Sequence, residues 1–156
     1  MGRPKYHSDR YKNGSMCPYC ELPTELVDSK VIYGKSYGMI YLCHKCRSYV
    51  GVHKGTSISL GRLANAELRH WKKEAHLWFN KLFELELMTR KESYQWLSEM
   101  MQLSANDTHI GMFDVKECQH VVYFSKQALN DNRRLDMDFG IPEPYPYYEL
   151  DNIITQ

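Results

Sequence analysis

Cys17-Pro18-Tyr19-Cys20 and Cys43-His44-Lys45-Cys46 are the two stretches that decide the fold, and 22 residues separate them. Two thiolates on one tight turn can both face a Zn²⁺ ion at about 2.3 Å, and two such turns complete a tetrahedron. Four thiolates leave no position for water, so the sequence predicts structural Zn²⁺ held by Cys17, Cys20, Cys43 and Cys46. A redox dithiol is the alternative, but it needs one C-x-x-C that opens a helix in a βαβ unit.

The segment between the two cysteine pairs has the composition of a β-hairpin. Residues 25–33 are rich in β-branched and aromatic side chains, residues 34–38 supply a turn, and residues 39–42 lead into Cys43. A hairpin between two cysteine turns predicts a zinc ribbon. His7, His44 and His53 lie near the cysteines in the sequence, and we expect each of them to face solvent or to form hydrogen bonds rather than to bind the metal.

The rest of the chain predicts three helices and then an irregular tail. Apolar residues at helical spacing predict a helix over residues 63–86, with a buried stripe that includes Leu68, Trp71 and Trp78. Thr89-Arg90-Lys91-Glu92 and Asp114-Val115-Lys116-Glu117 are capping signatures that start helices ending near residues 103 and 129, with a polar loop between them. That loop is too long for a helix-turn-helix, whose turn has about 3–4 residues.

These patterns together predict an α+β fold in three parts. Residues 1–61 form a zinc-ribbon module with a basic N-terminal arm, residues 62–129 form a helical region packed on it, and residues 130–156 form an acidic Tyr/Pro-rich tail. Alternating prolines in the tail exclude regular helix there. The fifth cysteine, Cys118, lies on the apolar face of the third helix, where we expect a small buried side chain. A nucleophilic Cys118 is the alternative, but His120 lies two positions away and would not face it on a helix.

The net charge of +1 over 156 residues is unevenly distributed. Residues 1–63 carry ten Lys and Arg against four Asp and Glu, whereas residues 105–156 carry four against nine. A basic first part indicates an anionic partner such as nucleic acid, DNA or RNA. The expected nucleic-acid-binding residues lie on the ribbon and on one face of the first helix: Lys45, Arg47, His53, Lys54, Arg62, Arg69, Lys72 and Lys73.

Several stretches resemble one known family. Cys17-Pro18-Tyr19-Cys20, Gly51-Val52-His53-Lys54-Gly55-Thr56 and His109-Ile110-Gly111-Met112-Phe113-Asp114 look like the zinc-finger-containing domain family of unknown function from bacteria and their phages. The resemblance covers roughly residues 15–125. It implies zinc and a bacterial or phage setting, and it carries no activity and no catalytic residues with it.

We therefore expect a non-enzymatic zinc-ribbon protein that binds nucleic acid and takes no small-molecule substrate. The alternative is a phage-encoded adaptor or inhibitor that docks on a host protein complex through the acidic aromatic tail. A nuclease is a third reading, with His53, His76 or His109 paired with Asp28 or Asp114. The N-terminus is not a signal peptide and no apolar run reaches the ~18 residues of a membrane span, so we expect a cytoplasmic protein with no membrane contact.

Overall fold

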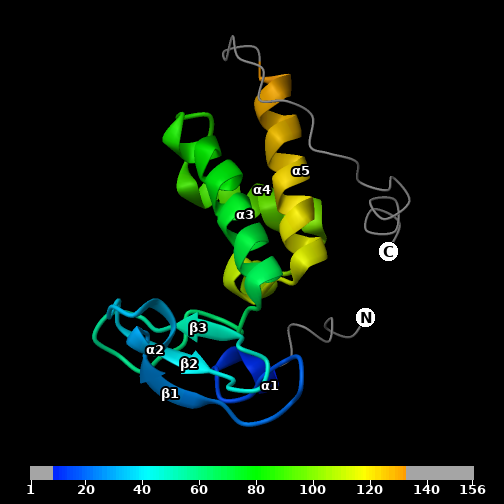
Figure 1. Ribbon diagram of the computed structural model, residues 1–156. Coiled ribbons are helices and arrows are strands. Elements are labelled where there is room, and N and C mark those ends of the chain that lie inside the picture. Colours follow the sequence, from blue (N-terminus) through cyan, green and yellow to red (C-terminus); the bar gives the residue numbers. More distant parts are fainter. Residues whose placement is uncertain (1–8, 133–156) are drawn as a thin grey trace. The chain divides into compact units, whose positions relative to one another are not determined.

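The computed structural model describes residues 9–132, so the predictions for the N-terminal arm and for most of the tail lie outside it (Figure 1). The chain divides into two compact units. The first, called the zinc unit below, contains the described residues up to His70 together with Gly111–Phe113. The second, the helical unit, contains Trp71–Ile110 and the described residues from Asp114 onward.

A three-stranded antiparallel sheet forms the centre of the zinc unit. Its strands are β1 (Glu25–Asp28), β2 (Met39–Leu42) and β3 (Tyr49–Gly51), in the order β1-β2-β3. The first two are the predicted hairpin, with Val27 opposite Ile40, and β3 pairs with the other side of β2. Ile40 and Leu42 are buried whereas Met39 is exposed, because successive side chains of a strand point to opposite faces.

The end of the first predicted strand is a helix instead. The composition of residues 25–33 predicts strand, but the structure forms the short helix α2 (Lys30–Tyr33). The Asp28 carboxylate accepts the backbone N–H of Lys30 at 2.9 Å, and Gly34 ends the turn at a φ of 73°. Side-chain hydrogen bonds of this kind offer the backbone a local alternative to the strand ladder.

Segments that precede and follow the sheet in the sequence complete the zinc unit. The helix α1 (Asp9–Lys12) precedes the first cysteine turn. After β3 the chain folds back, with bridges between Val52 and Ser59 and between Tyr49 and Ala64. The predicted polar loop at residues 104–113 is partly buried and contains two 3₁₀ helices, η2 (Ala105–Asp107) and η3 (Ile110–Met112). Thr108 and Ile110, which belong to the helical unit, and Phe113, which belongs to the zinc unit, are buried.

The three long helices are those that the sequence predicts. They are α3 (Ala66–Glu84), α4 (Arg90–Met101) and α5 (Val115–Asp131). The Asn65 side chain accepts the backbone N–H of Leu68 at 2.9 Å, so α3 begins later than residue 63. Thr89 and Asp114 both form complete capping boxes, as predicted.

The helical unit packs around aromatic and aliphatic side chains, and α3 and α5 run side by side in it (Figure 1). The fully buried Phe79 ring of α3 meets Tyr94 of α4 edge-on at 5.0 Å, and Lys126 of α5 lies 4.4 Å from the Trp78 ring. Cys118 is 0% exposed, which confirms its predicted burial. In the described ranges, no helix has both the length and the apolar character needed to cross a membrane.

Candidate metal centre

The two C-x-x-C turns have the same backbone hydrogen bonds. The N–H of Cys17 donates to Leu22 O at 3.0 Å, and the N–H of Glu21 donates back to Cys17 O at 2.8 Å. In the second turn, Cys43 and Ser48 form the first bond at 2.9 Å, and Arg47 donates to Cys43 O at 2.8 Å. Each turn is a short hairpin that projects its two cysteines to one side.

Both turns contain a residue in the left-handed backbone region. Glu21 has a φ of 61° and Arg47 has a φ of 58°, directly after the second cysteine of each pair. This conformation costs a non-glycine residue free energy and persists only where the surroundings fix it. The same conformation occurs at equivalent positions of two turns that otherwise differ in sequence. This indicates that the role shared by the cysteines, and not the residue type, fixes the geometry of the turn.

Hydrogen bonds point N–H groups at the first sulfur of each turn. The N–H of Tyr19 donates to Cys17 Sγ at 3.4 Å, and the N–H of Cys46 donates to Cys43 Sγ at 3.4 Å. The Ser48 hydroxyl lies 3.3 Å from Cys17 Sγ and joins the second turn to the first. Donors outside the coordination shell fix the orientation of thiolate ligands and stabilise their negative charge.

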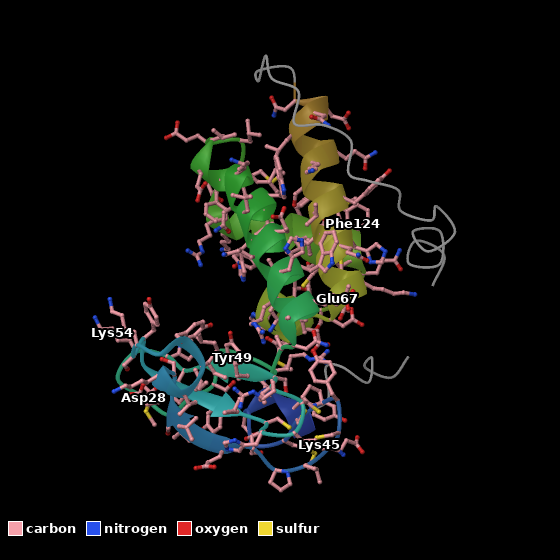
Figure 2. All side chains as sticks on the ribbon, viewed as in Figure 1. Asp28, Lys45, Tyr49, Lys54, Glu67 and Phe124 are labelled. Atoms are coloured by element: carbon pink, nitrogen blue, oxygen red, sulfur yellow. The ribbon has the colours of Figure 1, made fainter. Side chains whose placement is uncertain are left out.

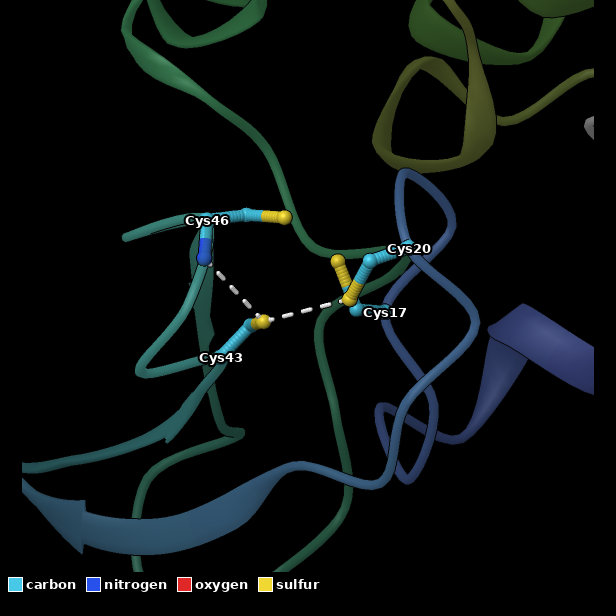
Figure 3. A group of neighbouring side chains, drawn as sticks. All are labelled: Cys17, Cys20, Cys43 and Cys46. Carbon is cyan, nitrogen blue, oxygen red and sulfur yellow. Dashed lines mark hydrogen bonds between the residues drawn. The ribbon is translucent and has the colours of Figure 1, made fainter.

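The four sulfur atoms converge on one point (Figure 3). All four Sγ atoms lie within 4.8 Å of one another, and Cys20 Sγ is 3.6 Å from Cys43 Sγ. A tetrahedron with Zn–S bonds of about 2.3 Å has edges of about 3.8 Å, so the sulfur positions fit this ion. The predicted ligands Cys17, Cys20, Cys43 and Cys46 are therefore brought together as a set.

The electrostatics of the cluster favour a bound cation. Burial alone would raise the pKa of Cys17, but hydrogen bonds from Ser48 and from backbone N–H groups lower that pKa to about 7. Burial and the neighbouring thiols raise the pKa of Cys46 to about 12. Four thiolates this close cannot all be ionised without a compensating charge, and a divalent metal supplies it and releases the protons.

The arrangement is that of a structural Zn²⁺ site. Cys17 and Cys43 are buried, Cys20 and Cys46 are half-buried, and Leu63 and Val50 pack against the cluster. Four sulfur ligands leave no coordination position for water or substrate, so the metal joins the two turns and does no chemistry. The sheet beside it has a small core, and metal binding then supplies folding free energy directly.

Two of the three histidines that lie near the cysteines in the sequence are exposed. His44, inside the second turn, forms a 2.8 Å contact with the Glu25 carboxylate, and both side chains are exposed. His53 is exposed in the loop after β3. His7 lies outside the described residues.

Within the zinc unit, the predicted nucleic-acid-binding residues do not form one patch (Figure 2). Lys45 and Arg47 are exposed in the second cysteine turn, and His53 and Lys54 are exposed in the loop after β3. Figure 2 shows Lys45 and Lys54 at opposite ends of the zinc unit. Lys72 and Lys73 lie on the part of α3 that belongs to the helical unit, where Lys73 is the more exposed.

Two of the predicted arginines contact other residues of the protein. Arg62 is only 3% exposed, and its guanidinium lies 5.7 Å from the Tyr19 ring, so it is not a surface donor. Arg69 stacks 4.1 Å above the Tyr49 ring and donates to Ala64 O at 2.6 Å. We correct the prediction for Arg62 accordingly, because its burial leaves no face for a phosphate.

The structure gathers three tyrosines, one from α2, one from the turn before β2 and one from β3. The Tyr33 ring meets Tyr37 at 5.5 Å and Tyr49 at 5.9 Å, both edge-on. Tyr33 and Tyr49 also share a hydrogen bond of 2.5 Å between their hydroxyls. The spacing of Tyr33 and Tyr37 around the glycine turn was the available signal, but Tyr49 joins them only through the folded sheet.

A comparison with known families agrees with the metal centre. A family model described as a zinc-finger-containing domain matches residues 13–128, which is most of the chain. The match covers the whole cysteine cluster and extends through the three long helices to the last turns of α5. No curated protein and no solved structure matches the chain.

Proposed function

Because the chain belongs to the zinc-finger-containing domain family and its metal centre is closed, we propose that it is a non-enzymatic binding protein whose zinc unit binds single-stranded nucleic acid. The zinc ion holds the scaffold, and the exposed side chains of the ribbon provide the contacts. The observation that carries this proposal is the cluster of Tyr33, Tyr37 and Tyr49, called the tyrosine cluster below.

The tyrosine cluster combines exposure with rigidity. Tyr37 is 72% exposed and Tyr33 is 51% exposed, which is unusual for large aromatic side chains. The edge-on contacts and the hydroxyl pair hold the rings in place before any ligand arrives. Bases stack on exposed aromatic rings with about 1–3 kcal/mol per base and with little sequence preference.

Cations accompany these rings. Lys35 Nζ lies 5.8 Å from the Tyr37 ring, and the Arg69 guanidinium covers Tyr49 at 4.1 Å. Lys45, Arg47 and Lys54 add exposed positive charge elsewhere on the zinc unit. Phosphate contacts from such residues give affinity without base information, so the binding is expected to be steeply salt-dependent and weakly sequence-selective.

The test is fluorescence anisotropy of labelled single-stranded DNA and RNA over a series of KCl concentrations. The double variant Tyr33→Ala/Tyr37→Ala is expected to weaken binding at least about tenfold, because each lost stacking contact is worth about 1–3 kcal/mol. Tyr33→Phe/Tyr37→Phe is the matched control, since it keeps the rings and should retain most of the affinity. If the alanine variant binds as tightly as the phenylalanine variant, stacking on the tyrosine cluster is not the mode of binding.

The helix face is tested separately. Lys73→Glu is expected to weaken binding if α3 contributes to the nucleic-acid surface. Lys91→Glu makes the same change of charge at an exposed position of α4 and is its control.

Incubation of the protein with DNA and RNA in the presence of Mg²⁺ tests the nuclease alternative, and we expect the strands to stay intact.

Docking on a host protein complex is the second candidate function. The segment invoked for it, the acidic Tyr/Pro-rich tail at residues 130–156, lies almost entirely outside the described residues. Its composition of tyrosine and acidic residues suits a basic protein surface. Purification from the native cell separates the two candidates, because a nucleic-acid-binding protein loses its partner on nuclease treatment and a protein adaptor does not.

A further inference from the structure

An open pocket of about 780 Å³ lies in the zinc unit, and its described lining contains neither a cysteine nor a residue of the tyrosine cluster. One wall is the loop that follows α1, and the other is the loop that follows β3. Tyr41 of β2 belongs to the pocket lining as well. The lining residues are Lys12, Asn13, Ser15, Tyr41, His53, Ser57, Ile58 and Ser59. This volume is in the range of about 300–1,000 Å³ that is typical of small-molecule sites.

The first wall is held in place by hydrogen bonds and by close packing. The Asn13 carboxamide oxygen accepts both the N–H of Ser15 at 3.0 Å and its hydroxyl at 2.6 Å. Gly14 lies so close to Tyr41 that a Cβ there would be 2.7 Å from a ring carbon. The wall that carries Lys12 is therefore preformed against the Tyr41 ring.

The second wall is equally fixed. The N–H of His53 donates to Ile58 O at 2.8 Å, which closes the loop at its base. The Thr56 N–H donates to His53 O at 2.9 Å, and the Tyr41 hydroxyl donates to Ser57 O at 2.6 Å. Tyr41 thus ties both walls together, and ligand binding needs no ordering of either loop.

The chemistry of the lining selects an anion attached to a flat or apolar group. Among the described lining residues there is no Asp or Glu, whereas Lys12 and His53 provide a cation and a ring nitrogen. The hydroxyl protons of Ser15 and Ser59 are donated within the protein, so the Ser57 hydroxyl and the Asn13 amide NH₂ are the further donors. Tyr41 and the exposed Ile58 provide aromatic and aliphatic surface beside them. Phosphate oxygens accept from such donors, and a base packs on such apolar surface.

We propose that this pocket binds a nucleoside phosphate, with the phosphate at Lys12 and His53 and the base against Tyr41 and Ile58. This proposal rests on the proposed function for its biological setting. In a protein that binds nucleic acid, the nucleotide in the pocket is one unit, or the phosphorylated end, of a bound strand. A free mononucleotide has the same chemistry and is the other possible source. The pocket and the tyrosine cluster share no residue, so each can be tested without the other.

The first experiment titrates the zinc-loaded full chain with thymidine 5′-monophosphate, with thymidine and with inorganic phosphate, and follows binding by calorimetry and NMR shifts. The monophosphate is expected to bind and to shift the signals of the two loops, and thymidine is expected to bind at least about tenfold more weakly. Lys12→Ala/His53→Ala should lower monophosphate affinity at least about tenfold, because hydrogen bonds to charged groups are worth about 1.5–3 kcal/mol. Lys30→Ala is the matched control, since Lys30 is exposed elsewhere on the zinc unit and does not line the pocket.

The second experiment compares oligonucleotides with and without a 5′-phosphate. Preference for the phosphorylated strand that disappears in Lys12→Ala/His53→Ala supports a strand end as the ligand, and binding of the monophosphate alone supports a free mononucleotide. If strands bind through the tyrosine cluster while the monophosphate and the pocket variant have no effect, the pocket proposal is overturned and the proposed function stands. If neither strands nor monophosphate bind, both proposals are overturned. Zinc content and thermal unfolding of each variant confirm that the folded protein is being compared.

Discussion

Gly61 and Gly111, which lie far apart in the sequence, are in direct backbone contact within the zinc unit. A Cβ atom on Gly61 would clash with the carbonyl group of Gly111, and a Cβ atom on Gly111 would lie 2.7 Å from Leu60 O. The Gly111 carbonyl also accepts the N–H of Arg62 at 3.3 Å. The two glycines therefore permit the segment Gly111–Phe113 to pack against the loop that leads from the sheet to α3.

Alanine at either of these glycines is expected to be strongly destabilising. The new methyl group would meet backbone atoms, which cannot rotate away, so we expect a loss of about 3 kcal/mol in the free energy of unfolding for Gly61→Ala. Gly34→Ala is the control: it has a φ of 73° but open space around its Cβ, so its cost is about 1 kcal/mol of backbone strain. Urea denaturation measures both, and equal midpoints for the two variants would contradict the steric argument.

The local patterns in the sequence predict most of the elements. The cysteine turns, the hairpin and both capping boxes each depend on residues within a few positions of one another, so the sequence carries their signals directly. The helix α2 was missed because Asp28 and Gly34 outweigh the strand preference of Val31 and Ile32. The entry of Gly111–Phe113 into the zinc unit depends on a contact with Gly61, and no local pattern reports such a contact.

The candidate site was predictable to a different degree in its two parts. The metal ligands follow from spacing alone, because tetrahedral geometry restricts where four thiolates can be. The binding surface does not follow from charge alone, because arginine side chains are long enough to turn inward. Arg62 and Arg69 do so, and each of them packs against a tyrosine ring.

We predict that each chain binds one Zn²⁺ ion and that the zinc unit unfolds when this ion is removed. Cys46→Ser should abolish the structure of this unit, because three thiolates cannot close the tetrahedron and the small core depends on the metal. Elemental analysis of freshly purified protein and NMR spectra recorded before and after a chelator measure the two quantities. Protein that is folded yet free of zinc would contradict the prediction.

Cys118→Ser tests the other kind of cysteine and serves as the matched substitution for Cys46→Ser. We expect full zinc content and unchanged binding, with a loss of about 1–3 kcal/mol in unfolding free energy, because a hydroxyl replaces a thiol in an apolar site. The fully buried Cys118 should also react slowly with a thiol reagent in the folded protein. Rapid labelling of Cys118 under native conditions would show that the site opens readily.

The capping box of α4 predicts a pH dependence of stability. The backbone N–H of Thr89 donates to Glu92 Oε1 at 3.1 Å, and this bond together with the Thr89 side chain lowers the pKa of Glu92 below its ordinary value of 4.5. A carboxyl group with a lowered pKa stabilises the folded state above the unfolded pKa, and that contribution is lost as the pH falls through the folded pKa. Glu92→Gln should therefore destabilise the protein at pH 7 and make much less difference near pH 3.

Urea denaturation of the wild type and of Glu92→Gln at the two pH values measures this effect. Glu99→Gln removes one negative charge elsewhere on the same helix and controls for the change in net charge. Thr89→Ala should cost about 1 kcal/mol at pH 7, as is usual for the loss of an N-cap side chain. A difference between wild type and Glu92→Gln that stays constant from pH 7 to pH 3 would argue against the role of the Glu92 charge.

Removal of residues 133–156 is expected to strengthen the binding of nucleic acid. This segment carries five acidic and two basic residues, so its net charge of −3 opposes the positive charge of the zinc unit. An acidic segment on the same chain competes with a strand for the cations, and it also repels the strand at longer range. A chain that ends at Asn132 keeps α5 complete, so the change in affinity is not confounded by loss of a helix.

The gain in affinity should be greatest at low salt and should shrink as the ionic strength rises, because counterions screen the tail and the strand alike. A full-length variant in which Asp136, Asp138, Glu143, Glu149 and Asp151 are changed to the corresponding amides separates charge from length, and it should bind as tightly as the shortened chain. If the shortened chain binds more weakly than the full chain, the tail contributes contacts of its own. In that case its tyrosines, rather than its charge, are the residues to substitute next.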